Sequence, residues 1–132
     1  MNQPKWISLL FWIAALYDGI LGALFLVSPN YIFDRFQIAP PNHVGYVQFP
    51  AALLLIFALM FIAIARNPRA NCRLIVYGIL LKVAYCGLTF YHWAAADIPI
   101  IWKPFAIIDL VMGVLFVVAW QTLSQPAAEP AR

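Results

Sequence analysis

Four apolar stretches, each close to the length of a membrane-spanning helix, dominate this chain. They cover residues 6–27, 47–65, 74–93 and 101–120. A helix needs about 20 residues to cross the hydrocarbon core of a bilayer, and lipid cannot satisfy the backbone polar groups of open structures. Only 10% of the 132 residues are charged, whereas soluble domains have about a quarter. The sequence therefore predicts an all-α membrane protein, with one four-transmembrane-helix domain over residues 1–123.

The connections between the stretches predict the topology. The second and third connections are short, which favours antiparallel neighbours in an up-down bundle. The first connection, residues 28–45, mixes apolar and polar side chains, which predicts a short interfacial helix. That helix would either cap the bundle or act as a lid over an outward-opening cavity. Residues 124–132 are rich in proline and small residues, and we expect them to form a disordered cytoplasmic tail.

Basic residues flank the four stretches unequally. Two of them, Arg35 and Lys103, fall on one side of the predicted membrane. The other side receives Lys5, Arg66, Arg69, Arg73 and Arg132. The positive-inside rule places the second group, and with it both termini, in the cytoplasm. The net charge of +3 is too small and scattered to predict binding to nucleic acid.

Three ionisable residues, Asp18, Lys82 and Asp109, lie near the middle of three different apolar stretches. A charge at the bilayer centre costs about 2.5–3.5 kcal/mol on insertion scales, so such groups pair with one another or face a cavity. Two acids and one base at similar depth predict a single polar centre. Two interpretations remain open at this stage. The centre is either an ion pair that fixes which helices meet, or a site where the surplus negative charge holds a ligand or proton.

Helical spacing adds further side chains to this centre. Tyr85 shares a face with Lys82, and Tyr17 flanks the face that carries Asp18. Small residues next to the charges allow neighbouring helices to approach closely. Toward the outer side of the membrane, polar and aromatic residues are expected to line a cavity: Gln48, Thr89, His92 and Trp102.

Sequence motifs for catalysis are absent from the chain. It contains no CxxC pair, HExxH motif, serine triad or glycine-rich phosphate loop. Its two cysteines and two histidines do not have the number and spacing of a metal site. We therefore predict neither catalytic residues nor metal ligands.

Several short motifs carry a resemblance to a known family. They are Leu16-Tyr17-Asp18-Gly19, then Leu-Phe-Leu-Val-Ser-Pro at 24–29, Phe-Gln-Ile-Ala-Pro at 36–40, Ala-Arg-Asn-Pro at 65–68 and Gly-Ile-Leu-Leu-Lys-Val at 78–83. In these the chain resembles the small four-helix bacterial membrane proteins grouped as DoxX-like, many of which are uncharacterised. The resemblance implies a multi-pass protein of the bacterial inner membrane. Some members are linked to quinone-coupled sulfur oxidation, but no residue pattern here carries that activity over.

Three classes of function follow from these features. The first is a non-catalytic protein that binds a small hydrophobic or amphipathic ligand, a lipid or a quinone, at the Asp/Lys centre, or that serves as accessory subunit of a membrane enzyme. The second is a small proton-coupled transporter or exporter with Asp18 as the coupling acid. The third is a membrane-embedded enzyme using Lys82, Asp109 and Tyr85 as acid–base groups. The exposed apolar sides of four short helices would also suit a homodimer.

Overall fold

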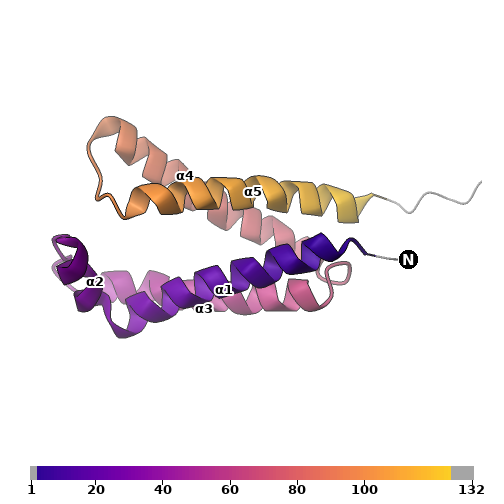
Figure 1. Ribbon diagram of the computed structural model, residues 1–132, viewed down its shortest axis with the longest axis horizontal. Coiled ribbons are helices and arrows are strands. Elements are labelled where there is room, and N and C mark those ends of the chain that lie inside the picture. The colour runs from indigo at the N-terminus through magenta and orange to yellow at the C-terminus, as the bar shows by residue number, and fades with distance from the viewer. Residues whose placement is uncertain (1–2, 126–132) are drawn as a thin grey trace, which may run out of the picture.

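The computed structural model describes residues 3–125, and over this range the chain is helical (Figure 1). The long helices are α1 (Lys5–Val27), α3 (Gly45–Arg66), α4 (Ile75–Ala95) and α5 (Trp102–Ser124), and a 3-10 turn at Cys72–Leu74 leads into α4. All four are long and apolar enough to cross a membrane. The prediction of an all-α protein with four membrane-spanning helices is confirmed, and the chain is a multi-pass integral membrane protein. Helix α5 includes Ser124, so the predicted tail begins at least one residue later than expected, and its residues 126–132 lie outside the described residues.

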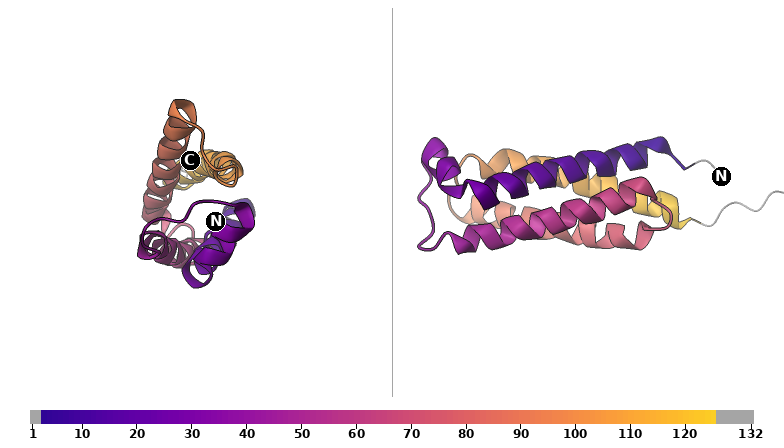
Figure 2. Two further views of the ribbon diagram at one scale, coloured as in Figure 1. Left: turned by 90° about the vertical axis from the view of Figure 1, so that its left-hand side faces the viewer. Right: turned by 90° about the horizontal axis from the view of Figure 1, so that it is seen from below.

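Successive long helices run in opposite directions, as predicted for an up-down bundle (Figures 1 and 2). The start of α1, the α3–α4 connection and the end of α5 share one end of the molecule, which we call the terminal end. Four basic residues lie there, namely Lys5, Arg66, Arg69 and Arg73. No acidic residue accompanies them within residues 3–125, whereas Arg35 and Lys103 at the opposite end are accompanied by Asp34 and Asp97. The charge asymmetry expected from the sequence is therefore present in the fold.

The opposite end, which we call the α2 end, carries the short helix α2 (Pro29–Phe36) in the first connection. Proline suits the first position of a helix because its missing N–H would have no partner there. Ile32 and Phe33 are buried, whereas the polar side of the helix is exposed. The helix ends at Phe36, because the next residue, Gln37, has a left-handed backbone with a φ of 52°. The short helix predicted in this connection is confirmed.

Helices α1 and α3 form one closely packed pair. A Cβ atom added to Gly22 of α1 would lie 2.8 Å from the carbonyl oxygen of Ala51 in α3, so only glycine permits this approach. At the terminal end, the Ser8 hydroxyl donates to the Ala65 carbonyl oxygen at 2.6 Å. Small residues and short polar contacts are the usual means by which helices associate in lipid, where apolar burial gives no driving force. Helices α4 and α5 form the second pair (Figure 2).

The two pairs meet in the terminal half of the bundle through an aromatic cluster of Phe11, Phe61 and Phe116. All three side chains are fully buried. The ring centroids of Phe11 and Phe116 lie 4.6 Å apart, and those of Phe61 and Phe116 lie 5.3 Å apart. Gly78 of α4 makes room for the cluster, because a Cβ there would lie 2.8 Å from Cε1 of Phe61. Further buried residues complete this core: Ile7, Leu10, Ala14, Ile64, Ile75, Ala119 and Leu123.

Candidate functional site

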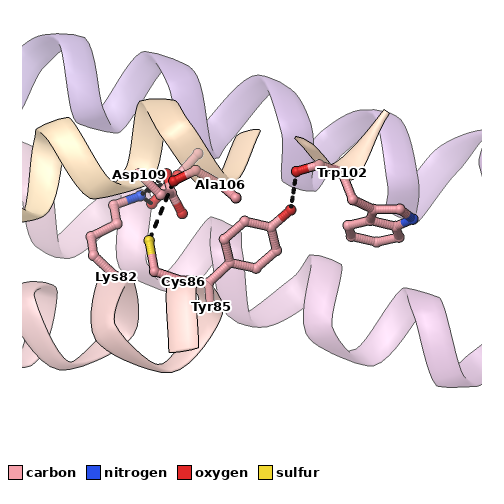
Figure 3. A network of polar contacts seen from close by, with 7 residues as sticks. Lys82, Tyr85, Cys86, Trp102, Ala106 and Asp109 are labelled. Atoms are coloured by element: carbon pink, nitrogen blue, oxygen red, sulfur yellow. Dashed lines mark hydrogen bonds and ion pairs between the residues drawn. The ribbon is translucent and has the colours of Figure 1, made fainter. Parts of the chain in front are cut away.

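The three charged residues predicted to form one polar centre lie together in the middle of the bundle. The Lys82 ammonium on α4 donates to Oδ1 and Oδ2 of Asp18 on α1, at 3.1 and 3.2 Å. It also donates to Oδ1 of Asp109 on α5, at 3.0 Å (Figure 3). Asp18 and Lys82 are each 1% exposed and Asp109 is 7% exposed. This ion triad joins the two helix pairs.

The position of Lys82 depends on small residues in the helices around it. Gly113 follows Asp109 by one helical turn, and a Cβ on it would lie 3.3 Å from Cβ of Lys82. The glycine therefore lets the lysine stem pass close to α5. Next to it, the Cys86 thiol donates to the Ala106 carbonyl oxygen at 3.4 Å (Figure 3), which adds another α4–α5 contact. The α4–α5 pair thus holds the lysine where both carboxylates can reach it.

The hydrogen bonds of the triad leave one carboxylate oxygen unused. An ammonium group has three N–H donors, and all three of Lys82 are directed at carboxylate oxygens. Within the described residues, Oδ2 of Asp109 receives no hydrogen bond. Two carboxylates and one ammonium also leave a formal charge of minus one at this depth. The triad therefore carries a surplus negative charge, and its free hydrogen-bond acceptor is an oxygen of Asp109.

A cavity of about 340 Å³ occupies the half of the bundle between the triad and the α2 end. We call this the cavity half. Asp18, Asp109 and Tyr17 are the polar side chains at the end of the cavity nearest the triad, and Lys82 does not line it. The walls are apolar and aromatic, formed by Leu21, Phe25, Tyr46, Val47, Pro50, Ala51, Leu53, Leu54, Phe57, Leu81, Tyr85, Trp102 and Phe105. Ligand sites have volumes of about 300–1,000 Å³ and combine apolar walls with a few placed polar groups.

The two sides of this cavity differ. Between α1 and α5, aromatic pairs close the wall, with ring centroids 6.2 Å apart for Tyr17 and Phe105 and 6.4 Å apart for Phe25 and Trp102. Between α3 and α4 the helices diverge toward the α2 end (Figures 1 and 2). On that side the lining residue Tyr46 is 70% exposed. The cavity therefore communicates with the surroundings of the bundle between α3 and α4.

The Tyr17 hydroxyl has no hydrogen-bond partner within residues 3–125 although its oxygen is buried. Its ring lies beside the triad, with Nζ of Lys82 5.4 Å from the ring centroid. Leaving a buried polar group unpaired costs about 1–3 kcal/mol. Tyr85, by contrast, donates its hydroxyl to the Trp102 carbonyl oxygen at 3.4 Å (Figure 3). Tyr17 thus lines the cavity and carries a hydroxyl without a partner among the described residues.

Three of the four residues that the sequence assigned to an outer cavity lie close together. Trp102 lines the cavity. Thr89 and His92 line an adjoining groove beside α4, which shares Trp102, Tyr85 and Leu81 with the cavity. Gln48 lies outside both sets of lining residues, and its side-chain amide donates to the Leu26 carbonyl oxygen at 3.0 Å. Gln48 therefore ties the end of α1 to α3.

Sequence reasoning overlooked Phe25, Phe57 and Tyr46 as cavity residues. Phe25 follows Asp18 by seven residues, which is two helical turns, so both lie on one face of α1. That spacing was a usable signal. The role of Tyr46 depends on the divergence of α4 from α3, and helical periodicity carries no information about that divergence.

No protein-family model, curated protein sequence or solved structure matches this chain. The resemblance to DoxX-like proteins, carried by motifs such as Leu16-Tyr17-Asp18-Gly19, stays a prediction. The geometry of the ion triad and of the cavity beside it is the basis for the function proposed below.

Proposed function

We propose that the protein binds a small hydrophobic or amphipathic molecule, of the lipid or quinone class, in the cavity beside the ion triad. The observation that carries this proposal is an otherwise apolar cavity lined by two carboxylates and by Tyr17, whose hydroxyl has no partner among the described residues. An amphipathic ligand matches this arrangement, because its head can meet the polar groups while its tail lies among the aromatic walls.

The fold supports entry from the lipid phase. The cavity opens between α3 and α4, where Tyr46 and Leu53 are exposed along its wall. Basic residues cluster at the terminal end, which favours a cytoplasmic location for both termini in a bacterial inner membrane. In that orientation the cavity lies in the outer half of the membrane. A ligand dissolved in the outer leaflet would reach it without crossing water.

A matched pair of substitutions on α1 tests ligand binding. Leu21 lines the cavity one turn beyond Asp18, whereas Leu24 on the same helix is 49% exposed and does not line it. Leu21→Trp should fill the cavity, and Leu24→Trp should leave it open. Mass spectrometry of small molecules that co-purify with each folded variant should detect a defined lipid or quinone in the wild type and in Leu24→Trp. That molecule should be at least tenfold depleted in Leu21→Trp.

Two results would count against the proposal. Equal retention of the molecule by Leu21→Trp would place binding outside the cavity. If the wild type retained nothing specific, wild-type protein should be titrated with short-chain quinones and lipids in nanodiscs. A complete absence of saturable binding there would reject the ligand-binding function. Both variants need near-wild-type thermal melting for the comparison to hold.

Proton-coupled transport is the second candidate, and the charge of the triad favours it. The unused Oδ2 of Asp109 belongs to a side chain that lines the cavity, and the surplus negative charge is suited to hold a proton that leaves when a substrate binds. Reconstituted protein would then drive substrate uptake into liposomes under a proton gradient, and Asp109→Asn would abolish it. As an accessory subunit or homodimer, the protein would use its exposed apolar helix faces, such as Leu9, Leu16 and Ile20 on α1.

A further inference from the structure

The cavity presents negative charge without an available positive charge. Asp18 and Asp109 line it, whereas Lys82 is covered by the two carboxylates that it bonds. Within the described residues, the other cations lie at the ends of the helices or in the connections. The basic residue nearest along the chain to the cavity wall is Lys103, and its ammonium is bonded to Asp97 at 3.0 Å. An anionic head group would therefore meet repulsion and no compensating cation.

From this geometry we infer that the preferred ligands of the cavity are amphipathic molecules with a protonated amine as the head group. The inference rests on the ligand-binding function proposed above and narrows its chemical class. An ammonium head would donate to Oδ2 of Asp109, which receives no hydrogen bond in the triad. It would also bring the formal charge of the site from minus one to zero. Opposite charges attract more strongly where water is excluded, because the local dielectric constant is low.

The Tyr17 hydroxyl supplies a second contact for the same head group. A hydroxyl oxygen accepts hydrogen bonds as well as donating one, and this one has no partner among the described residues. An ammonium group has three donors, which is enough for both Asp109 and Tyr17 in the same cavity. A carbonyl head, as in a quinone, accepts hydrogen bonds only, and would satisfy Tyr17 while leaving the Asp109 oxygen unpaired. An alcohol satisfies both groups but leaves the negative charge uncompensated.

The walls of the cavity suit a cation as well. Aromatic rings carry negative charge on their faces and attract cations within about 6 Å. Rings of Phe25, Phe57, Tyr85, Trp102 and Phe105 line the cavity. The face of Tyr17 already lies 5.4 Å from the Lys82 ammonium, so the remaining rings are the ones available to a ligand. Aromatic walls and a surplus carboxylate together favour a lipophilic amine over a neutral molecule of the same shape.

Three probes that differ only in their head group test this inference. Phenylbutylamine, phenylbutanol and phenylbutyrate are cationic, neutral and anionic at pH 7. Their binding should be measured by calorimetry with the full chain in nanodiscs of phosphatidylcholine, whose zwitterionic surface does not concentrate either ion. We expect the amine to bind at least tenfold more tightly than the alcohol, which corresponds to about 1.4 kcal/mol. The carboxylate should bind most weakly.

Asp109→Asn separates the charge of the site from its shape. This variant keeps the Lys82–Asp18 pair and makes the triad neutral. The ratio of the dissociation constants of the alcohol and the amine should therefore fall from at least ten to about one. Asp34→Asn is the matched control, because Asp34 lies exposed on α2 outside the cavity. It should keep the full preference. If Asp109→Asn does not fold, Leu21→Trp takes its place and should remove binding of all three probes.

The outcomes distinguish this inference from the function on which it rests. Equal binding of amine and alcohol to the wild type would overturn the amine inference and leave ligand binding intact. A preference that persists in Asp109→Asn would also overturn it, because the charge would then be irrelevant. If none of the probes binds and no lipid or quinone binds either, the ligand-binding function itself is rejected.

Discussion

The terminal half and the cavity half of this bundle are built from the same four helices and similar side chains, yet one is packed and the other is not. In the terminal half, Phe11, Phe61 and Phe116 are fully buried against one another. In the cavity half, Phe25 and Phe105 line a space of about 340 Å³. Both halves are rich in aromatic residues, so composition does not explain the difference. The difference arises because the two helix pairs lie farther apart in the cavity half than in the terminal half (Figure 1).

Helix α4 sets that distance. At Gly78 it approaches closely enough for its backbone to contact the Phe61 ring, and from there it diverges from α3 toward the α2 end (Figure 1). Lys82 lies one turn beyond Gly78, at the boundary between the two halves. The triad therefore holds the helix pairs together at the point where apolar packing stops. One ion cluster thus separates a packed region from a cavity in a small bundle.

The largest effect should come from breaking the triad at this boundary. Lys82→Met leaves two buried carboxylates without a cation, and losing one partner of a buried pair typically costs about 3–5 kcal/mol. Thermal melting of the detergent-solubilised protein should show a corresponding loss of stability. The Lys82→Met, Asp109→Leu double variant should recover part of it, because only Asp18 then stays unpaired.

Lys103→Met provides the control for the removal of a lysine. Its ammonium group pairs with Asp97, whose side chain is 88% exposed, so this substitution should change stability little. If the losses in the double variant were simply additive, Lys82 and Asp109 would not be coupled. Lys82 and Asp109 would then not act together as members of one ion triad.

A glycine pair on α4 gives an intermediate effect and tests the packed half directly. Gly78→Ala places a Cβ 2.8 Å from Phe61, and that ring is held by Phe11 and Phe116 and cannot move freely. Overpacking of this kind costs about 1–3 kcal/mol. Gly87→Ala on the same helix meets nothing within 4 Å, and should leave the melting temperature unchanged or slightly higher, since alanine is the better helix former. Equal losses in both variants would show that the terminal half is not tightly packed.

The smallest effect should come from the exposed ion pair at the α2 end. The hydrogen bond from Lys103 lowers the pKa of the Asp97 carboxyl. A lowered pKa in the folded state means that the pair stabilises the fold above the ordinary pKa of aspartate, and that this contribution disappears as the pH falls through the lowered pKa. Since Asp97 is exposed to solvent, Asp97→Asn should leave the melting temperature at pH 7 unchanged within error. A clear loss at pH 7 would show that the α2 end contributes to stability as the triad does.

Much of the architecture could be predicted from the sequence because its causes are local. The length of each apolar stretch predicts a membrane-spanning helix, and short connections predict antiparallel neighbours. Asp18, Lys82 and Asp109 each lie near the middle of an apolar stretch, and this similar depth predicted that they would meet. The role of Gln48, which bonds the end of α1, could not be predicted in the same way. It depends on which neighbouring helix lies opposite and how far away that helix is.

Taken alone, the sequence predicts a chain that crosses a membrane with four helices and carries three charges in its interior, because length, hydropathy and the cost of burying a charge are properties of single segments. The packing on one side of the triad and the cavity on the other follow only from contacts between helices. One such contact joins Gly78 to Phe61 and fixes where α4 packs against α3. Beyond that point α4 diverges from α3 toward the α2 end, where the cavity lies (Figure 1). Residues far apart in the chain make this contact, so no single segment specifies it.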